Sequence, residues 1–506
     1  MKTYILLILS IFTICPTLAK EGSRRMIQSI HAKPAYFAVH ITGIETISED
    51  LKIVFWRNDL LDSVHLFGKN ADDKNSFYFE LSPFEFPSRI QLYLKRLNPS
   101  MILDWQLVLP GDSVHVWINT SSTNSYQLSF TGRGVEKYKC SNALAPLRRE
   151  VNDLWRKVQS WSNTNEGDAN PELISNEMGL LMAKYSRVLD TYRAKLDRNT
   201  YNILQADLKG YAKHQQLKIT ATAYAEAAKT KKVLFETSLK ELLFSESEIT
   251  DPIVLAQSSE YREYIYEKHK IELLLQRSKN FTIFDMGSTA SISCGELYNI
   301  LKYGYKGTLR EKLLAQLFIY SRDLSNFFRK IDEDALAYYL EDAVELIQTP
   351  FLKHKLFAKL ANNTKGKTAY DFALPNLRGD TVRLSDFKGK VVFIDVWGYP
   401  CGGCLSFKRK FETEVYPMIK DNPDFVVISI NLSDEKSVWL KALDQYSDPR
   451  FINLAAGLGN RNHFDNHYNI GAIPFLILID RQGKIVTTNL RDTDELLSLI
   501  KQTLAR

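Results

Sequence analysis

The spacing of apolar residues changes twice along this 506-residue chain, and that change constrains the fold more than any other feature. In 20–138, apolar residues alternate with polar ones, as in Phe77–Leu81, Ile90–Leu94 and Val114–Ile118. A period of two with β-branched and aromatic side chains is typical of strands that bury one face. We therefore expect an antiparallel β-sandwich over 20–138.

Between 139 and 362 the apolar residues recur every three or four positions instead. One such stripe consists of Met178, Leu181, Met182, Tyr185, Leu189, Tyr192 and Leu196. This is the period of an α-helix with one buried face. An α-helical region is expected here, and its apolar and tyrosine stripes are interpreted as core and not as a cofactor site.

A third pattern occupies 366–506, after the polar stretch Ala361–Thr368. An almost continuous apolar run, Val391–Trp397, is followed by a helix-like stretch to about Lys420 and by a second apolar run, Phe425–Asn431. The order strand, helix, strand predicts a βαβ unit with parallel strands. The chain is thus expected to be multidomain, with an α/β domain at its C-terminal end.

The first residues, 1–19, have the form of a secretory signal peptide: one lysine, an apolar run and a small-residue cleavage site at Ala19. A lipoprotein would use Cys15 as its acylated residue, but Ile14 stands where a small residue is wanted, so lipid anchoring is the weaker alternative. We expect export, to the periplasm in a bacterial cell.

The formal net charge of +6 is small for a chain of this length. Recognition of nucleic-acid phosphates requires concentrated basic patches, so this charge gives no support to nucleic-acid binding. The basic group around Lys229, Lys231 and Lys232 lies in a helix-like stretch and is interpreted as a solvated helix face.

Two of the five cysteines, Cys401 and Cys404, are three residues apart, directly after the buried run that ends at Trp397. Cys401 is expected to begin a helix, where free backbone N–H groups and the helix dipole stabilise a thiolate. One helical turn further on, Cys404 lies within reach of a disulfide but is more sheltered. The spacing therefore predicts that Cys401 attacks and that Cys404 resolves.

The residues around the cysteine pair suit a bond that opens and closes. Gly402 and Gly403 make the first helical turn pliable, since each glycine costs about 1 kcal/mol relative to alanine inside a helix. Asp395 lies in a strand that is otherwise apolar. A buried carboxyl group has a raised pKa, so Asp395 is the candidate acceptor of the resolving thiol's proton.

Other uses of a Cys-x-x-Cys motif fit less well. A zinc site would need a second pair of ligands, and a c-type haem attachment would need histidine where Leu405 stands. His463 and His467 lack the glutamate of a zinc-protease motif. A permanent structural disulfide stays open as an alternative; we expect no metal and no cofactor.

Several motifs of 366–506 together resemble the thioredoxin superfamily, in particular its exported TlpA/ResA-like branch. They are Asp371–Pro375, Gly379-Asp380, Leu384–Lys390, the Val391–Trp397 run, Cys401-Gly-Gly-Cys404, Gly471–Pro474 and Asp480–Lys484. This resemblance implies a thioredoxin fold with a cis proline at Pro474 that faces the disulfide. It also implies thiol:disulfide oxidoreductase activity on cysteine-containing proteins, with a membrane or soluble thiol partner to exchange electrons.

By the same resemblance, Cys401 is the nucleophile, Cys404 the resolving thiol and Asp395 the buried acid or base. Trp397 would pack the site. We expect the substrate-binding residues to be Trp397, the backbone of Ile473, and Pro474, together with Pro400 at the lip of the site.

The chain departs from the family pattern at several positions. Pro400 replaces the usual tryptophan and Gly403 the usual proline, and Phe407 stands where the exported branch often has a glutamate. Ser429 is the approximate counterpart of the lysine that accompanies the buried aspartate in thioredoxin. A peroxiredoxin has a similar sequence before its reactive cysteine, but it would need threonine or serine where Gly398 stands, so this enzyme class is the weaker alternative.

Cys140 and Cys294 have no cysteine close in sequence and are expected to be buried free thiols, with a mutual disulfide as the alternative. The region before 366 is similar to accessory regions of exported bacterial proteins, a similarity that assigns no chemistry. A different class is therefore also open, a partner- or envelope-binding protein with a redox-responsive thioredoxin-like module. The residues leave the direction of electron flow, the substrate and the oligomeric state open.

Overall fold

The computed structural model describes residues 32–46, 50–59, 62–70, 75–163, 170–227, 229–244, 251–277, 293–319, 333–433, 436–457, 461–468, 470, 473–488, 490 and 492–506. The expected signal peptide, Cys15, and Gly471 with Ala472 lie outside these ranges. The chain forms two compact units. The first consists of Met1–Asn58 and Asp62–Tyr138, and the second of Asp59–Leu61 and Lys139–Arg506.

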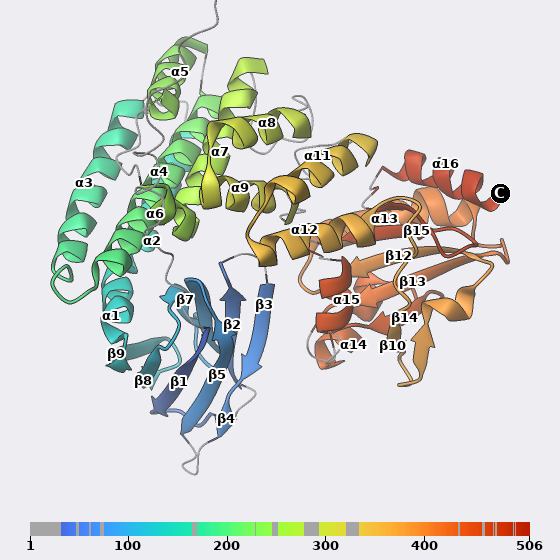
Figure 1. Ribbon diagram of the computed structural model, residues 1–506, viewed down its shortest axis with the longest axis horizontal. Coiled ribbons are helices and arrows are strands. Elements are labelled where there is room, and N and C mark those ends of the chain that lie inside the picture. The colour runs from blue at the N-terminus through green and yellow to red at the C-terminus, as the bar shows by residue number, and fades with distance from the viewer. Residues whose placement is uncertain are drawn as a thin grey trace, which may run out of the picture. The chain divides into compact units, whose positions relative to one another are not determined.

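The first unit contains two sheets (Figure 1, blue to teal). Its strands are β1 (Lys33–Thr42), β2 (Leu51–Arg57), β3 (Asp62–Phe67), β4 (Lys69–Asn70), β5 (Ser76–Phe84), β6 (Ser88–Leu94), β7 (Met101–Val108), β8 (Ser113–Ser122) and β9 (Ser125–Arg133). The sheet orders are β4-β5-β1-β8-β9 and β3-β2-β6-β7, and alternate residues of both sheets share one apolar core. The three runs that we expected to be strands lie in β5, β6 and β8.

One pairing in this unit departs from the expected antiparallel arrangement. Strands β1 and β8 run parallel, with Phe37 opposite Val114 and Ile41 opposite Ile118. Parallel neighbours need a long crossover connection. Strands β2 to β7 provide it: β2, β3, β6 and β7 form the other sheet, and β4 and β5 belong to the same sheet as β1. A period of two records which face is buried and carries no information on strand direction.

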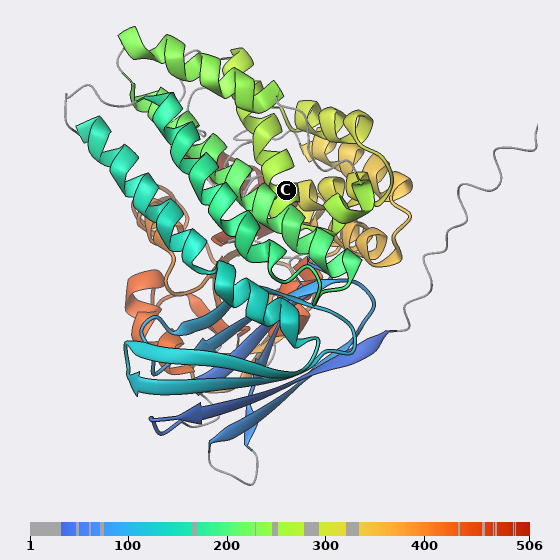
Figure 2. The ribbon, with the colours of Figure 1, turned by 90° about the vertical axis from the view of Figure 1, so that its left-hand side faces the viewer.

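Helices follow from 135 to 363. They are α1 (Val135–Leu144), α2 (Pro146–Asn163), α3 (Pro171–Asp190), α4 (Arg198–Glu226), α5 (Lys229–Phe244), α6 (Pro252–Gln257), α7 (Ser259–Arg277), α8 (Cys294–Gly304), α9 (Gly307–Ile319), α11 (Glu333–Leu346) and α12 (Pro350–Asn363). Figure 2 shows the long helices α3 and α4 side by side. Within the expected stripe, Met178, Tyr185 and Leu189 are buried, whereas α3 ends at Asp190, before Tyr192 and Leu196.

The C-terminal part of the second unit is built on a five-stranded sheet with the order β14-β13-β12-β15-β16 (Figure 1, orange and red). Its elements are β10 (Ala373–Pro375), β11 (Thr381–Arg383), β12 (Val391–Trp397), α13 (Gly402–Lys410), β13 (Phe425–Asn431), α14 (Lys436–Tyr446), β14 (Ile452–Ala455), α15 (Arg461–Tyr468), β15 (Phe475–Ile479), β16 (Ile485–Thr488) and α16 (Thr493–Leu504). Strands β12, β13 and β14 are parallel, and β15 pairs antiparallel with both β12 and β16. The predicted βαβ unit is confirmed.

The continuous apolar character of β12 follows from burial on both faces of the sheet. Val392, Ile394 and Val396 belong to one core, whereas Val391 and Phe393 belong to a second core on the other face. All seven residues of β12 are buried. Because β12 is the central strand, its carboxyl end and the cysteines that follow it are held in a fixed position.

Candidate active site

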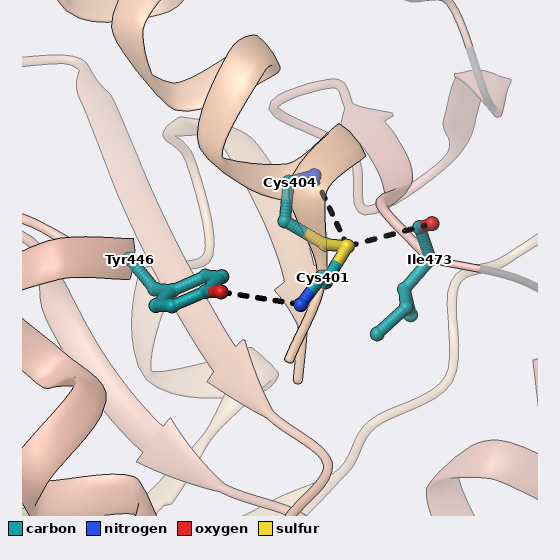
Figure 3. The surroundings of a disulfide bond; sticks show 4 residues. All are labelled: Cys401, Cys404, Tyr446 and Ile473. Carbon is teal, nitrogen blue, oxygen red and sulfur yellow. Dashed lines mark hydrogen bonds between the residues drawn. A yellow bond between two sulfur atoms is a disulfide. The ribbon is translucent and has the colours of Figure 1, made fainter. Parts of the chain in front are cut away.

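Cys401 and Cys404 are joined by a disulfide at the start of α13 (Figure 3). Cys401 is the N-cap residue, and the backbone N–H of Cys404 donates to its Sγ at 3.0 Å. Cys404 is buried, with 2% of its surface exposed, whereas Cys401 is partly exposed. The expected helix start and the expected difference in shelter are both confirmed. Of the two cysteines, Cys401 is therefore the more accessible residue.

A second contact to the sulfur comes from the loop before β15. Cys401 Sγ lies 3.8 Å from the carbonyl oxygen of Ile473, and the Ile473–Pro474 peptide bond is cis. The cis conformation implied by the resemblance is confirmed. A Cβ added at Gly403 would lie 3.4 Å from Pro474 Cδ, so the first helical turn packs closely on this proline. Pro400 precedes Cys401 and is exposed.

Sequence reasoning did not identify Tyr446, which contacts the backbone of the candidate nucleophile. The N–H of Cys401 donates to the Tyr446 hydroxyl oxygen at 3.2 Å (Figure 3). Tyr446 ends α14, where Trp439, Ala442 and Tyr446 form a buried stripe at helical spacing. That stripe is visible in the sequence, but it predicts only a buried helix face.

Trp397 packs against Tyr446. It is fully buried, its indole N–H donates to Ser429 Oγ at 2.7 Å, and its ring stacks on Tyr446 with centroids 5.2 Å apart. Trp397, Tyr446 and Cys404 belong to one buried cluster. Full burial means that Trp397 supports the site from within the domain.

Asp395 is buried in β12, opposite Ser429 of β13. Side chains two apart on a strand share a face, so Asp395 lies on the same face as Phe393 and Trp397. Phe393 packs on Phe407 of α13, with ring centroids 6.3 Å apart, and Trp397 shares a cluster with Cys404. Asp395 therefore occupies the face of the sheet that α13 covers.

The two other cysteines of the described chain lie in helical segments. Cys140 and Cys294 are free and buried, as expected. Burial raises the pKa of each thiol to about 12. Neither thiol is therefore suited to nucleophilic chemistry at neutral pH.

Two further findings concern the described residues. They contain no group of three or more His, Cys, Asp or Glu side chains arranged to hold a metal ion. None of their helices has the length and the apolar character that a membrane span requires. The His463 side chain lies outside the described set.

Residues 389–485 match the family described as Thioredoxin-like. They therefore form a thioredoxin-like domain around the disulfide. The match includes β12, both cysteines, Tyr446 and Pro474.

Relatives of this domain carry the name thiol-disulfide oxidoreductase ResA. The protein from Geobacillus kaustophilus is 29% identical over 120 residues, which is 24% of this chain and 66% of the relative. The protein from Bacillus subtilis is 26% identical over 133 residues, 26% of this chain and 70% of the relative. The match thus spans just under two thirds of the length of the Geobacillus protein.

Solved structures also match. The thioredoxin domain of a thiol-disulfide oxidoreductase from Bacteroides vulgatus is 27% identical, with 28% of this chain and 96% of that chain covered and a TM-score of 0.25. A thiol:disulfide interchange protein from Bacteroides sp. is 26% identical, with 28% and 92% covered and a TM-score of 0.26.

Proposed function

We propose that this protein is an exported thiol:disulfide oxidoreductase that exchanges disulfides with protein substrates through Cys401 and Cys404. The observation that carries the proposal is the position of Cys401, a partly exposed residue whose Sγ accepts the Cys404 N–H at the start of α13. A hydrogen bond to a charged sulfur, together with the helix dipole, stabilises the thiolate relative to the thiol. The names of the relatives support the same activity.

The reaction begins with the reduced pair. The Cys401 thiolate attacks one sulfur of a substrate disulfide and forms a new S–S bond. The substrate S–S bond breaks, and its electron pair leaves with the other substrate sulfur, which takes up a proton. Cys404 then loses its proton and attacks Cys401 Sγ; the mixed S–S bond breaks, and the second substrate sulfur leaves as a thiolate that takes up a proton. Two electrons have passed to the substrate, and the Cys401–Cys404 disulfide of this structure remains.

The surrounding residues take the following roles in this proposal. Asp395 accepts the proton of Cys404 from the face of the sheet that α13 covers. The Ile473 backbone and Pro474 hold an extended substrate segment beside the sulfur, and Pro400 forms the opposite lip. A membrane or soluble thiol partner restores the dithiol. Export depends on the signal-like residues 1–19.

The test compares Cys401→Ser with Cys294→Ser in the full-length protein. Reduced wild type and Cys294→Ser should cleave insulin disulfides at similar rates, because Cys294 is buried and takes no part in the Cys401–Cys404 disulfide. Cys401→Ser should lose the activity, and Cys404→Ser should accumulate mixed disulfides with substrates. Full activity of Cys401→Ser would overturn the proposal. It would favour a partner-binding protein with a redox-responsive domain.

A further inference from the structure

The nucleophile is held from two sides. Figure 3 shows Tyr446 on one side of Cys401 and Ile473 on the other. Ile473 faces the sulfur, whereas Tyr446 contacts the backbone nitrogen. The Tyr446 hydroxyl is separated from Cys401 by 45 residues of sequence, so this contact depends on the tertiary fold.

The contact with Tyr446 gives the backbone N–H of Cys401 a hydrogen-bond partner that the helix itself does not supply. Cys401 is an N-cap with extended backbone angles, φ −144° and ψ 98°. The N–H of an N-cap residue precedes the helix and has no helical partner. Tyr446 accepts that N–H, while Cys401 Sγ accepts the N–H of Cys404. Both the backbone and the side chain of Cys401 are thus held by hydrogen bonds.

The Tyr446 hydroxyl is itself held in place. The ring is buried, stacks on Trp397 at an interplanar angle of 10°, and makes a T-shaped contact with the Tyr399 ring at 81°. Trp397 in turn is fixed by its hydrogen bond to Ser429. A chain of packed and bonded side chains therefore leads from the middle of the sheet to the Cys401 backbone.

The hydrogen bond between the Cys401 N–H and the Tyr446 hydroxyl anchors the Cys401 backbone, and its effect on the position of the sulfur depends on whether the disulfide is formed. In the oxidised protein the bond to Cys404 already fixes Cys401 Sγ. In the dithiol that constraint is gone, and hydrogen bonds alone keep the sulfur at the helix start. An anchor on the backbone therefore stabilises the dithiol more than the disulfide.

We propose that Tyr446 is a positioning residue for the nucleophile, whose hydroxyl keeps the reduced Cys401 sulfur on the Cys404 N–H. This inference rests on the proposed thiol:disulfide exchange. Stabilising the reduced form makes a disulfide more oxidising. Loss of the hydroxyl should therefore favour the disulfide by roughly 3- to 10-fold, the size expected for one hydrogen bond, or about 15–30 mV toward more reducing potentials.

The experiment compares Tyr446→Phe with Tyr399→Phe in the full-length protein. Tyr446→Phe keeps the ring on Trp397 and removes the hydroxyl. Tyr399→Phe is the matched control, because it removes the hydroxyl of the adjacent ring, which is 55% exposed. Each variant is equilibrated with glutathione, and the iodoacetamide reaction of reduced Cys401 is followed against pH.

Tyr446→Phe should shift the glutathione equilibrium toward the disulfide and move the midpoint of the alkylation profile to higher pH. Tyr399→Phe should change neither. A Tyr446→Phe protein with the wild-type equilibrium and profile would overturn the inference while wild-type insulin reduction stands. If wild type itself reduces no disulfide, the proposed function fails instead.

A second measurement needs no variant. The amide hydrogen of Cys401 should exchange slowly with solvent in both the oxidised and the reduced wild-type protein, because Tyr446 accepts it in both. Rapid exchange of this amide in the reduced protein would contradict the inference, even if Tyr446→Phe did not fold.

Discussion

Replacement of Gly403 by proline tests how the first turn of α13 sets the redox potential. Gly403 is the second residue of the helix, and a proline there removes an N–H that has no helical partner. The added Cβ would lie 3.4 Å from Pro474 Cδ, an ordinary packing distance. The structure therefore has room for the Cβ of a proline at the position where the resemblance places one.

The expected effect comes from chain entropy. Proline in a compatible position removes backbone freedom worth roughly 0.4–1 kcal/mol. The disulfide already restricts this turn, so most of the freedom lost belongs to the dithiol. Since about 30 mV corresponds to 1.4 kcal/mol for two electrons, Gly403→Pro should make the potential roughly 10–20 mV more negative.

The assay equilibrates full-length protein with glutathione buffers, traps thiols with acid and alkylating agent, and counts them by mass. Gly403→Ala is the control, because it adds the same Cβ near Pro474 without closing a ring. A shift of equal size in Gly403→Ala would assign the effect to the new contact. An unmoved or more positive potential in Gly403→Pro would refute the reasoning.

Two further predictions concern protons. Asp395→Asn removes the proposed proton acceptor at constant shape. It should slow the release of substrate from the mixed disulfide by roughly 10²-fold, as rapid-quench mass spectrometry would show; an unchanged rate would exclude Asp395 from the step. The raised pKa of Cys140 and Cys294, about 12 for each, leaves on the order of 1 thiolate in 10⁴ at pH 8. Iodoacetamide should therefore modify reduced Cys401 first, and early labelling of either buried thiol in the folded protein would contradict their burial.

The arrangement around the cysteines could be predicted because local patterns determine it. A strand buried on both faces must be apolar almost throughout, so the apolar run Val391–Trp397 predicts this strand. The helix that follows begins where the cysteine pair begins. The parallel pairing with Phe425–Asn431 then follows from the order of the elements.

The features that sequence did not reveal depend on contacts between distant segments. Whether β1 and β8 run parallel depends on how the chain passes between two sheets, and side-chain alternation is the same for either direction. The Tyr446 contact requires α14 to lie with its C-terminal end beside Cys401. A buried tyrosine at helical spacing indicates a core position and says nothing about where its hydroxyl points.

The resolving step needs a group that accepts the proton of Cys404, and Phe407 cannot be that group. Cys404 is almost fully buried, so its proton must leave through the interior of the domain. In the exported branch a glutamate often stands at the position of Phe407, but here that side chain packs into the core against Phe393. Asp395 lies between Phe393 and Trp397 on the face that α13 covers, with Ser429 as its neighbour on β13. Asp395 is the carboxylate that shares this face of the sheet with Trp397, the packing partner of Cys404, and this placement is why we propose it as the acceptor in the resolving step.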